Sequence, residues 1–311
     1  MINISTDNRQ EQDNNQEVCN VVDGKYEYRK IQLEEYQSKY IYIPLSVITD
    51  VNLDIRRIGV FSYLRIHSGL NNIIGFTISD MVEWCGGKPD RRVNGTNDKT
   101  LSVLDCFESN NYLTYLTEKS RSSYMKCGFN SSYYGEDCSN GYAVIYLDEL
   151  DKIMNYKKEN SKDSTINNTS ILLVFSYFRN KIRRRKNELN PEERSSDGIK
   201  KRRERIPEAF DSNINIISDE IGISPKTLSK IIDILEYDLE LIVTDRLYRI
   251  KNKDDEFRTP PTIFANAYKR EDKYLLDTGD KYGRKEIKQK AENMKQYYQG
   301  YKIDKKKRKI K

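Results

Sequence analysis

Histidine is nearly absent from this chain of 311 residues, because His67 is the single example. Sites that need two histidines are therefore excluded, among them the paired-histidine metal centre of rolling-circle endonucleases and most zinc sites. The five cysteines form no CxxC pair, so neither a metal-binding pair nor a disulfide framework is expected. We expect no metal, no cofactor and no catalytic residues, and hence a protein that is not an enzyme.

Long apolar runs are also missing. The longest dense run, Ile171 to Phe175, is far too short to cross a bilayer. The first residues, MINISTDNRQEQDNNQ, have no apolar stretch of the kind that signal peptides carry. These absences predict a cytoplasmic protein that does not contact a membrane.

Positive charge is unevenly distributed. The formal net charge is +6, yet residues 181–205 alone carry 11 basic and 5 acidic side chains, and residues 281–311 carry 13 and 3. The rest of the chain is therefore acidic overall. Two basic segments are the places where an anionic partner is expected.

An internal repeat divides the rest of the chain. Val60 to Arg65 (VFSYLR) recurs as Val174 to Arg179 (VFSYFR). The tripeptide ISD at 78–80 recurs at 217–219, and KTLS at 99–102 recurs at 226–229. The three matches occur in the same order, which predicts two copies of one small domain with insertions of different length.

The second copy shows its elements most plainly. Ser218 is expected to cap a short helix that ends at Gly222, a residue suited to a left-handed helix end. Ser224 and Pro225 then predict the start of a second helix. Leu228, Ile231, Ile232 and Leu235 follow at helical spacing and predict its buried stripe. The segments around Thr244-Asp245 favour a β-hairpin.

The order of helix, helix-turn-helix and hairpin resembles winged-helix DNA-binding domains, and the segment ISDEIGISPKTLSKII carries the match. The chain is similar to plasmid replication initiators and phage replisome organisers that contain such domains, over roughly residues 39–275. The fold class that this implies is α+β and mainly helical, with two winged helix-turn-helix domains in tandem.

The first copy fits the same scheme less closely. The segment FTISDMVEWCGG is expected to form its first helix, and a second helix is expected to start near Asn97. Residues 112–118 and 142–147 are the expected wing strands, with a long connection at 119–141. The tyrosines in that connection (Tyr124, Tyr133 and Tyr134) are expected to pack and not to stack on bases.

The domain boundaries follow from these assignments. We expect a disordered acidic arm at 1–36, a first winged-helix domain at 37–150 and a linker at 151–169. A second winged-helix domain is expected at 170–275, with the basic insertion 181–205, followed by a basic tail at 276–311.

In a winged-helix domain the second helix enters the major groove with its first residues toward the bases. The expected groove residues share an exposed position near a helix start. They are Asn97, Lys99 and Thr100 in the first copy, and Ser224, Lys226, Thr227 and Lys230 in the second. The alternative is that such lysines form a solvated helix face.

A further set of basic residues is expected to contact phosphates outside the groove, so that affinity falls with salt. It comprises Lys88, Arg91, Arg92, Arg183, Arg184, Arg185, Lys200, Lys201, Arg202, Arg203 and Arg205. A disordered charged loop is the alternative for those in the insertion.

The resemblance implies sequence-specific binding of double-stranded DNA, in replication initiation or replisome organisation on a plasmid or phage. Replication proteins such as a helicase or its loader are the further partners that it implies. Two alternatives stay open. One is a transcriptional regulator that uses the same domains, and the other is a winged-helix module that binds proteins.

Overall fold

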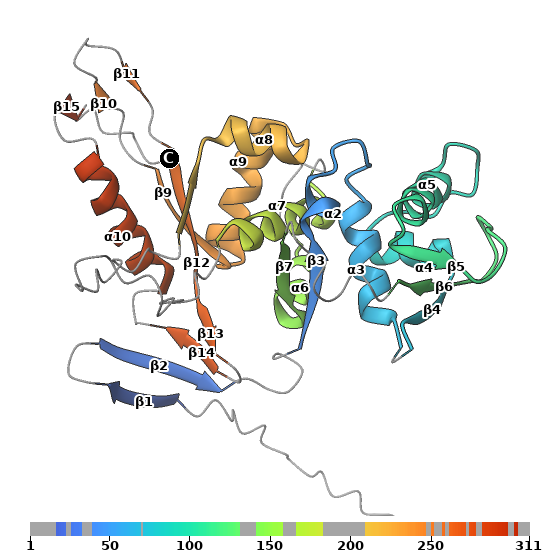
Figure 1. Cartoon of the computed structure of the whole chain (residues 1–311), viewed down its shortest axis with the longest axis horizontal. Helices are drawn as coiled ribbons and strands as arrows, with labels where there is room; N and C mark the ends of the chain where they lie inside the picture. Colours follow the sequence, from blue (N-terminus) through green and yellow to red (C-terminus); the bar gives the residue numbers. More distant parts are fainter. Residues whose placement is uncertain are drawn as a thin grey trace, which may run out of the picture.

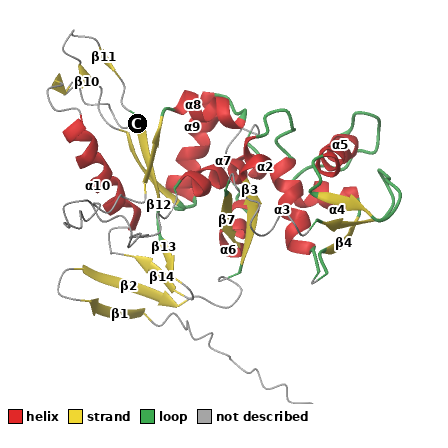
Figure 2. Cartoon of the chain, in the orientation of Figure 1, coloured by secondary structure: helices red, strands yellow, loops and turns green. Residues whose placement is uncertain are grey.

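The computed structural model of the chain describes residues 17–22, 26–32, 39–69, 71–130, 141–157, 166–182, 209–246, 250–251, 257–258, 261–271, 274–277, 282–297 and 302–303. The fold is α+β, as predicted, with small antiparallel sheets between helices (Figures 1 and 2). Within these ranges, no helix is both long and apolar enough to cross a membrane.

The first unit comprises residues 57–129. It consists of α3 (Arg57–His67), β4 (Ile73–Phe76), α4 (Ile78–Trp84), α5 (Thr96–Ser109), β5 (Leu113–Tyr115) and β6 (Met125–Phe129). The three strands form an antiparallel sheet in the order β4-β6-β5. Along β6, Met125, Cys127 and Phe129 are buried and alternate with more exposed residues. This period of two places one face of the sheet against the helices.

The second unit comprises residues 168–266 and has the same order of elements. It consists of α7 (Asn168–Lys181), β8 (Ala209–Ser212), α8 (Ile214–Ile221), α9 (Pro225–Asp233), β9 (Ile242–Arg246) and β12 (Thr262–Asn266), with a π-helical turn, η2 (Ile234–Asp238), after α9. Its sheet order is β8-β12-β9. In both units the strand that comes last in the sequence lies in the middle of the sheet. The two copies of the predicted repeat therefore have the same sheet topology.

The strands around the hairpins differ from the prediction. β5 pairs with β6, which lies inside the expected connection, while β7 (Tyr142–Tyr146) pairs with β3 (Tyr40–Pro44). In the second unit Thr244 and Asp245 lie within β9 and pair with β12. β10 (Ile250–Lys251) and β11 (Phe257–Arg258) continue this pairing in the same register. Thr244 and Asp245 are therefore strand residues and not the predicted turn.

Helix α8 also begins earlier than predicted. It starts at Ile214, so Ser218 lies inside the helix and is buried instead of capping it. Its hydroxyl donates a hydrogen bond to the carbonyl of Ile223, which fastens the turn between α8 and α9. Gly222 has φ 73° and ends α8 in the left-handed conformation, as expected.

One hydrophobic core extends through both units. It runs from Ile41 on β3 to Phe264 on β12, with the fully buried stretch Ile171–Phe175 of α7 at its centre. α7 contacts α2 (Leu45–Thr49), α3, α6 (Leu147–Met154) and α9. The expected linker at 151–169 thus contains the end of α6 and the start of α7, and residues of both units belong to this core.

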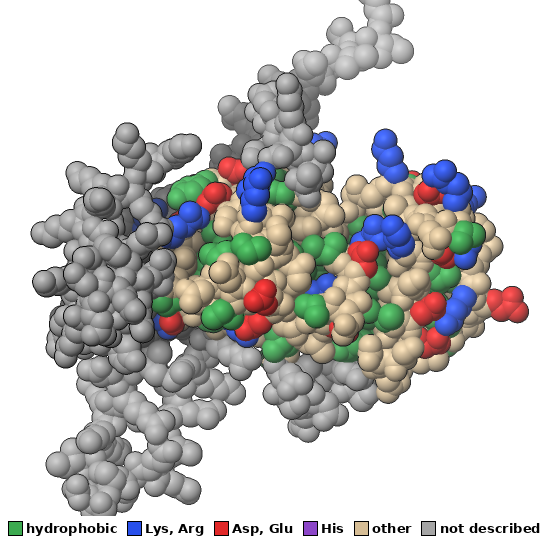
Figure 3. Space-filling view, turned by 90° about the horizontal axis from the view of Figure 1, so that it is seen from above, with side chains coloured by type: hydrophobic (Ala, Val, Ile, Leu, Met, Phe, Trp, Pro, Cys, Tyr) green, Lys and Arg blue, Asp and Glu red, His purple; other side chains and the backbone are tan. Residues whose placement is uncertain are grey.

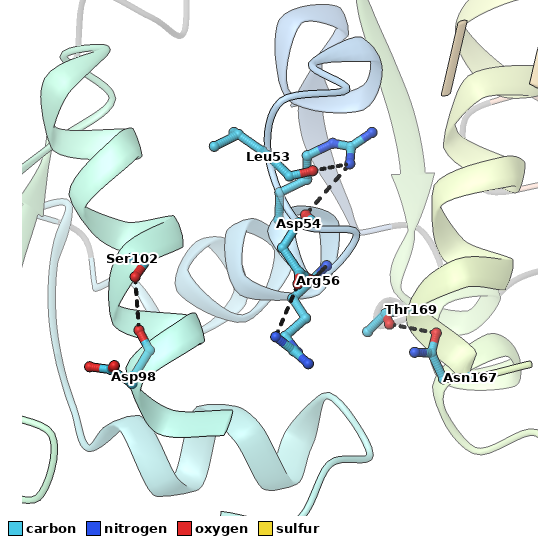
Figure 4. A network of polar contacts seen from close by, with 8 residues as sticks. Leu53, Asp54, Arg56, Asp98, Ser102, Asn167 and Thr169 are labelled. Carbon is cyan, nitrogen blue, oxygen red and sulfur yellow. Dashed lines mark hydrogen bonds and ion pairs between the residues drawn. The ribbon is translucent and has the colours of Figure 1, made fainter. Parts of the chain in front are cut away.

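Arg57 connects the units at this core. Its side chain is 2% exposed, and its guanidinium donates hydrogen bonds to the carbonyls of Val47, Ile48 and Leu53 at 2.8–2.9 Å, and to that of Ile221 at 3.3 Å. Figure 4 shows the Leu53 and Asp54 carbonyls that face it. Two of the acceptors lie near the C-terminal ends of α2 and α8, where the helix dipole favours a cation.

The N-terminal segment is not entirely an arm. β1 (Glu17–Val22) and β2 (Tyr26–Gln32) form a sheet with β14 (Tyr274–Asp277) and β13 (Lys269–Glu271), in the order β1-β2-β14-β13. The expectation of disorder across 1–36 is therefore wrong for these two strands.

The C-terminal segment, expected only as a basic tail, contains a helix. α10 (Tyr282–Tyr297) packs against the second sheet, with Ile287 and Ala291 on Val243, Ile263 and Ala265. A Cβ at position 283 would lie 2.1 Å from the carbonyl oxygen of Asn266. Only a glycine fits at position 283, because the two backbones approach so closely there. β15 (Lys302–Ile303) pairs with β10. The final lysine-rich residues, 304–311, lie outside the described residues.

Candidate nucleic-acid interface

The start of α9 is built by local hydrogen bonds. The Ser224 hydroxyl accepts a hydrogen bond from the Thr227 amide at 3.3 Å and lies 2.9 Å from the Thr227 hydroxyl. Pro225 occupies the first helical turn, where its missing N–H costs nothing. Ser224 and Thr227 thus have a capping role, and any contact with a ligand would be additional to it.

The exposed face of α9 begins with a lysine. Lys226 is exposed and makes no hydrogen bond or ion pair with any residue that the structure describes. Lys230, one turn later, is half-buried. The opposite face carries Leu228, Ile231, Ile232 and Leu235, all at most 1% exposed, as the spacing predicted. A cation is therefore presented beside a helix start, where amide groups also favour anions.

The second hairpin is fixed beside α9. Arg246 on β9 forms an ion pair with Asp233 at 2.7 Å. Thr244 donates from its amide to the carboxylate of Glu236 at 2.9 Å, and from its hydroxyl at 2.7 Å. These contacts join the hairpin to the C-terminal end of the helix and leave the N-terminal end, with Lys226, uncovered by them.

The first unit presents its second helix differently, and two predictions about it are wrong. Asn97 is 0% exposed and Thr100 is 1% exposed. Asn97 accepts a hydrogen bond from the amide of Asp90 at 3.1 Å, and donates to the Ser79 hydroxyl at 3.2 Å and the Arg121 carbonyl at 3.0 Å. Asn97 thus connects the loop before α5 to α4 and to the connection between β5 and β6. The loop 85–95, an insertion relative to the second unit, folds over this end of α5, so only Lys99 of the predicted trio is exposed.

The same loop carries the predicted phosphate contacts of the first unit. Lys88 and Arg91 are exposed and have no side-chain partner among the described residues. Arg92 is exposed but forms a bidentate ion pair with Asp90, at 2.7 Å for its shortest contact. The hydrogen bonds from Arg92 lower the pKa of Asp90 to about 2. The pair uses Nε and one Nη of Arg92 and offsets its charge, which makes Arg92 a weaker phosphate contact than Lys88 or Arg91.

The connection between β5 and β6, residues 116–124, is held on α5 by ion pairs. Lys119 contacts Asp105 at 2.9 Å and Glu108 at 2.7 Å, and Arg121 contacts Asp98 at 2.6 Å. The cations of this connection therefore neutralise acidic side chains of the helix. The exposed flank of α5 combines both signs and is less suited to a polyanion than that of α9.

Figure 3 shows one face of the molecule, seen from above the view of Figure 1. Lys and Arg side chains form separate groups there, with apolar and acidic side chains between them. The predicted contacts of the basic insertion lie outside the described residues. They are Arg183, Arg184, Arg185, Lys200, Lys201, Arg202, Arg203 and Arg205.

The prediction did not find one surface feature, a row of tyrosines on the β3-β7 ribbon. Tyr40, Tyr42, Tyr142 and Tyr146 lie on its outer face. The signal in the sequence is the alternation YIYI at 40–43 and YAVIY at 142–146, but it becomes a surface only when the two strands pair.

The described residues contain no group of three or more His, Cys, Asp or Glu side chains that could hold a metal ion. Comparison of the chain with protein-family models, with curated proteins and with solved structures gave no match. Functional inference therefore depends on the geometry of the chain itself.

Proposed function

We propose that the chain binds double-stranded DNA through two winged-helix units, with α9 as the helix that enters the major groove. The observation that supports this most is the uncovered start of α9. There Lys226 projects from a capped helix that follows a tight left-handed turn at Gly222 and precedes a hairpin. A helix-turn-helix places this end of its second helix toward base edges and phosphates.

The topology supports the same proposal for both units. Each has the order helix, strand, helix, helix, strand, strand, and each has the last strand in the middle of a three-stranded antiparallel sheet. A winged helix is expected to have this order, with its last two strands forming the wing beside the second helix, and the shared order therefore supports the proposal.

The two units have different roles in this proposal. α9 reads the groove, while the first unit contacts phosphates through Lys88, Arg91 and Lys99, which are exposed without partners among the described residues. Phosphate contacts set the position of a protein on DNA, whereas groove contacts select the sequence. The second unit would then determine which sequence is bound.

The proposed process is replication initiation or replisome organisation on a plasmid or phage. The chain would act by binding and by recruiting a helicase or its loader. Mapping the bound sites on the replicon distinguishes this from transcriptional regulation, because an initiator occupies an origin and a regulator occupies promoters.

The proposal is tested by reversing charge on α9. The double variant Lys226→Glu/Lys230→Glu should weaken binding to origin duplex by about tenfold or more, and lower the slope of log affinity against log salt by about 2. The matched control is Lys152→Glu/Lys157→Glu, which makes the same charge change at two exposed lysines at and beyond the end of α6. Equal binding by both double variants would refute the assignment of α9.

One observation favours a second function for the first unit. Asp98, Asp105 and Glu108 give α5 an acidic flank that is bridged to the wing. Because these carboxylates are paired with Lys119 and Arg121, the flank carries both signs, and a protein surface that also carries both signs would suit it better than a polyanion would. Loss of a replication partner by an Asp105→Asn/Glu108→Gln variant that keeps duplex binding would support that role.

A further inference from the structure

The β3-β7 ribbon separates aromatic and aliphatic residues between its two faces. Tyr40 pairs with Tyr146, Tyr42 with Val144, and Pro44 with Tyr142. The alternating residues Ile41, Ile43, Ala143 and Ile145 are all at most 5% exposed and belong to the core. The tyrosines therefore all lie on the face that points away from the core.

The four rings form a continuous row. The ring centroids of Tyr142 and Tyr42 are 4.7 Å apart, those of Tyr42 and Tyr40 are 5.1 Å apart, and those of Tyr40 and Tyr146 are 5.8 Å apart. All three pairs are edge-to-face. Tyr40 is 47% exposed and Tyr142 is 44% exposed, so the row remains open to solvent at two places.

Packing within the row does not account for that exposure. Edge-to-face pairs stabilise a ribbon when the rings are buried, and aromatic rings in folded proteins are mostly covered. Here two rings are nearly half exposed on one short ribbon. An exposed aromatic surface of this kind is typical of a binding site.

Cations border the row at one end. The guanidinium of Arg270 lies 4.2 Å from the centroid of the Tyr146 ring, but its side chain is 6% exposed and pairs with Asp148 and Glu149, so it covers this ring and is not offered to a ligand. Beside Tyr40 there is a shallow open groove of about 450 Å³, lined also by Lys39, Arg65 and Ile66. Tyr40, Lys39 and Arg65 thus line the same groove at this end of the row.

We propose that this ribbon binds single-stranded DNA, with bases stacked on Tyr40 and Tyr142 and the backbone passing near Lys39 and Arg65. Every base has a flat face that can stack on an aromatic ring, and the phosphates require nearby positive charge. A duplex keeps its bases inside and cannot use such rings. This site goes beyond the proposed duplex contact by α9, and it would hold a strand once the duplex has opened.

A protein partner is the main competitor for the same surface. Exposed tyrosines also occur at protein interfaces, but the neighbouring cations Lys39 and Arg65 favour an anionic ligand. The groove next to Tyr40 combines apolar and basic walls, which suits a base with its attached phosphate. Single-stranded DNA is therefore the ligand that fits both features.

The test measures binding of a fluorescein-labelled oligothymidylate to the full chain by fluorescence anisotropy. Tyr40→Ala and Tyr142→Ala should each weaken binding by about fivefold to a hundredfold, the range that follows from the loss of one stacked base. Tyr40→Phe and Tyr142→Phe keep the ring and should bind like the unchanged chain. Tyr124→Ala removes another exposed tyrosine away from the ribbon, and should also bind normally.

The α9 variant separates this inference from the proposed function. Lys226→Glu/Lys230→Glu should lose duplex binding and keep oligothymidylate binding, because the two sites use different residues. The ribbon site would be overturned if the unchanged chain did not bind oligothymidylate, or if the alanine variants of Tyr40 and Tyr142 bound normally. An equal loss in Tyr124→Ala would overturn it too.

A second measurement does not depend on the stability of the variants. An oligonucleotide that contains 5-iododeoxyuridine can be crosslinked by light to the unchanged chain, and the modified peptides identified by mass spectrometry. We expect crosslinks at Tyr40 or Tyr142. Crosslinks confined to other parts of the chain would contradict the proposal.

Discussion

The two repeated units contain the same sequence fragments and yet present their second helices differently. In the second unit, residue 224 caps α9 at an exposed position, and Lys226 follows it without a partner among the described residues. In the first unit, the corresponding Asn97 is buried under the loop 85–95 and binds three neighbours. An inserted loop can thus bury a helix start that is exposed in the other unit, while the helix itself is kept.

The backs of the two sheets differ in a similar way. In the second unit, α10 covers Val243, Ile263 and Ala265. In the first unit, the corresponding face is open to solvent, and exposed apolar side chains lie on it or beside it. They are Ile73, Leu116 and Tyr124. The second sheet is therefore covered by α10. The outer face of the first sheet is not covered in this way, and its residues there are Gly75, Lys126 and Gly128.

The largest effect is expected at the joint between the units. Arg57→Ala removes a buried charge and leaves four carbonyls without their donor, so we expect the free energy of unfolding to fall by about 3–5 kcal/mol. Urea unfolding followed by circular dichroism measures this change. Arg56→Ala, at the neighbouring half-exposed residue paired with Asp54, should cost at most about 1 kcal/mol. A similar small loss for both would show that Arg57 does not join the units.

A smaller loss is expected where α10 covers the second sheet. Ile287→Ala should lower the free energy of unfolding by about 2–3 kcal/mol, because it leaves a cavity against Val243 and Ile263. Ile73→Ala, on the uncovered back of the first sheet, should change it by no more than about 0.5 kcal/mol. Thermal or urea unfolding of the two variants compares the sheets directly. Equal losses would contradict the difference between them.

The helix starts should differ in stability and in DNA binding. Asn97→Ala breaks three hydrogen bonds in a buried site and should cost about 1–3 kcal/mol, while Ser224→Ala loses one cap and should cost about 1 kcal/mol. Duplex affinity of the folded Asn97→Ala protein should be unchanged. A large loss of affinity without a loss of stability would mean that Asn97 reaches the DNA after all.

Local signals predicted α9 correctly. Gly222, Ser224 and Pro225 act within one turn of chain, and the stripe from Leu228 to Leu235 has a period that needs no knowledge of other elements. The start of α8 was misplaced because Ser218 has the residue type of a cap, although Asn213 precedes the helix and Ser218 is buried inside it.

Strand pairing and burial depend on distant parts of the chain, and here the prediction failed. Residues 142–146 alternate like any edge strand, so nothing local indicates that they pair with 40–44 instead of with 113–115. The burial of Asn97 and Thr100 depends on how residues 85–95 fold over α5. The tyrosine row could not be found because it needs both strands in register.

The most direct test of the central claim compares two equivalent lysines of the repeat. Lys226→Glu on α9 and Lys99→Glu on α5 make the same change at corresponding, exposed positions. Duplex affinity measured by fluorescence anisotropy at several salt concentrations should fall by about tenfold or more for Lys226→Glu. It should fall by no more than about threefold for Lys99→Glu, whose helix start is covered by the loop. Equal losses, or a greater loss for Lys99→Glu, would contradict the assignment of α9 as the reading helix.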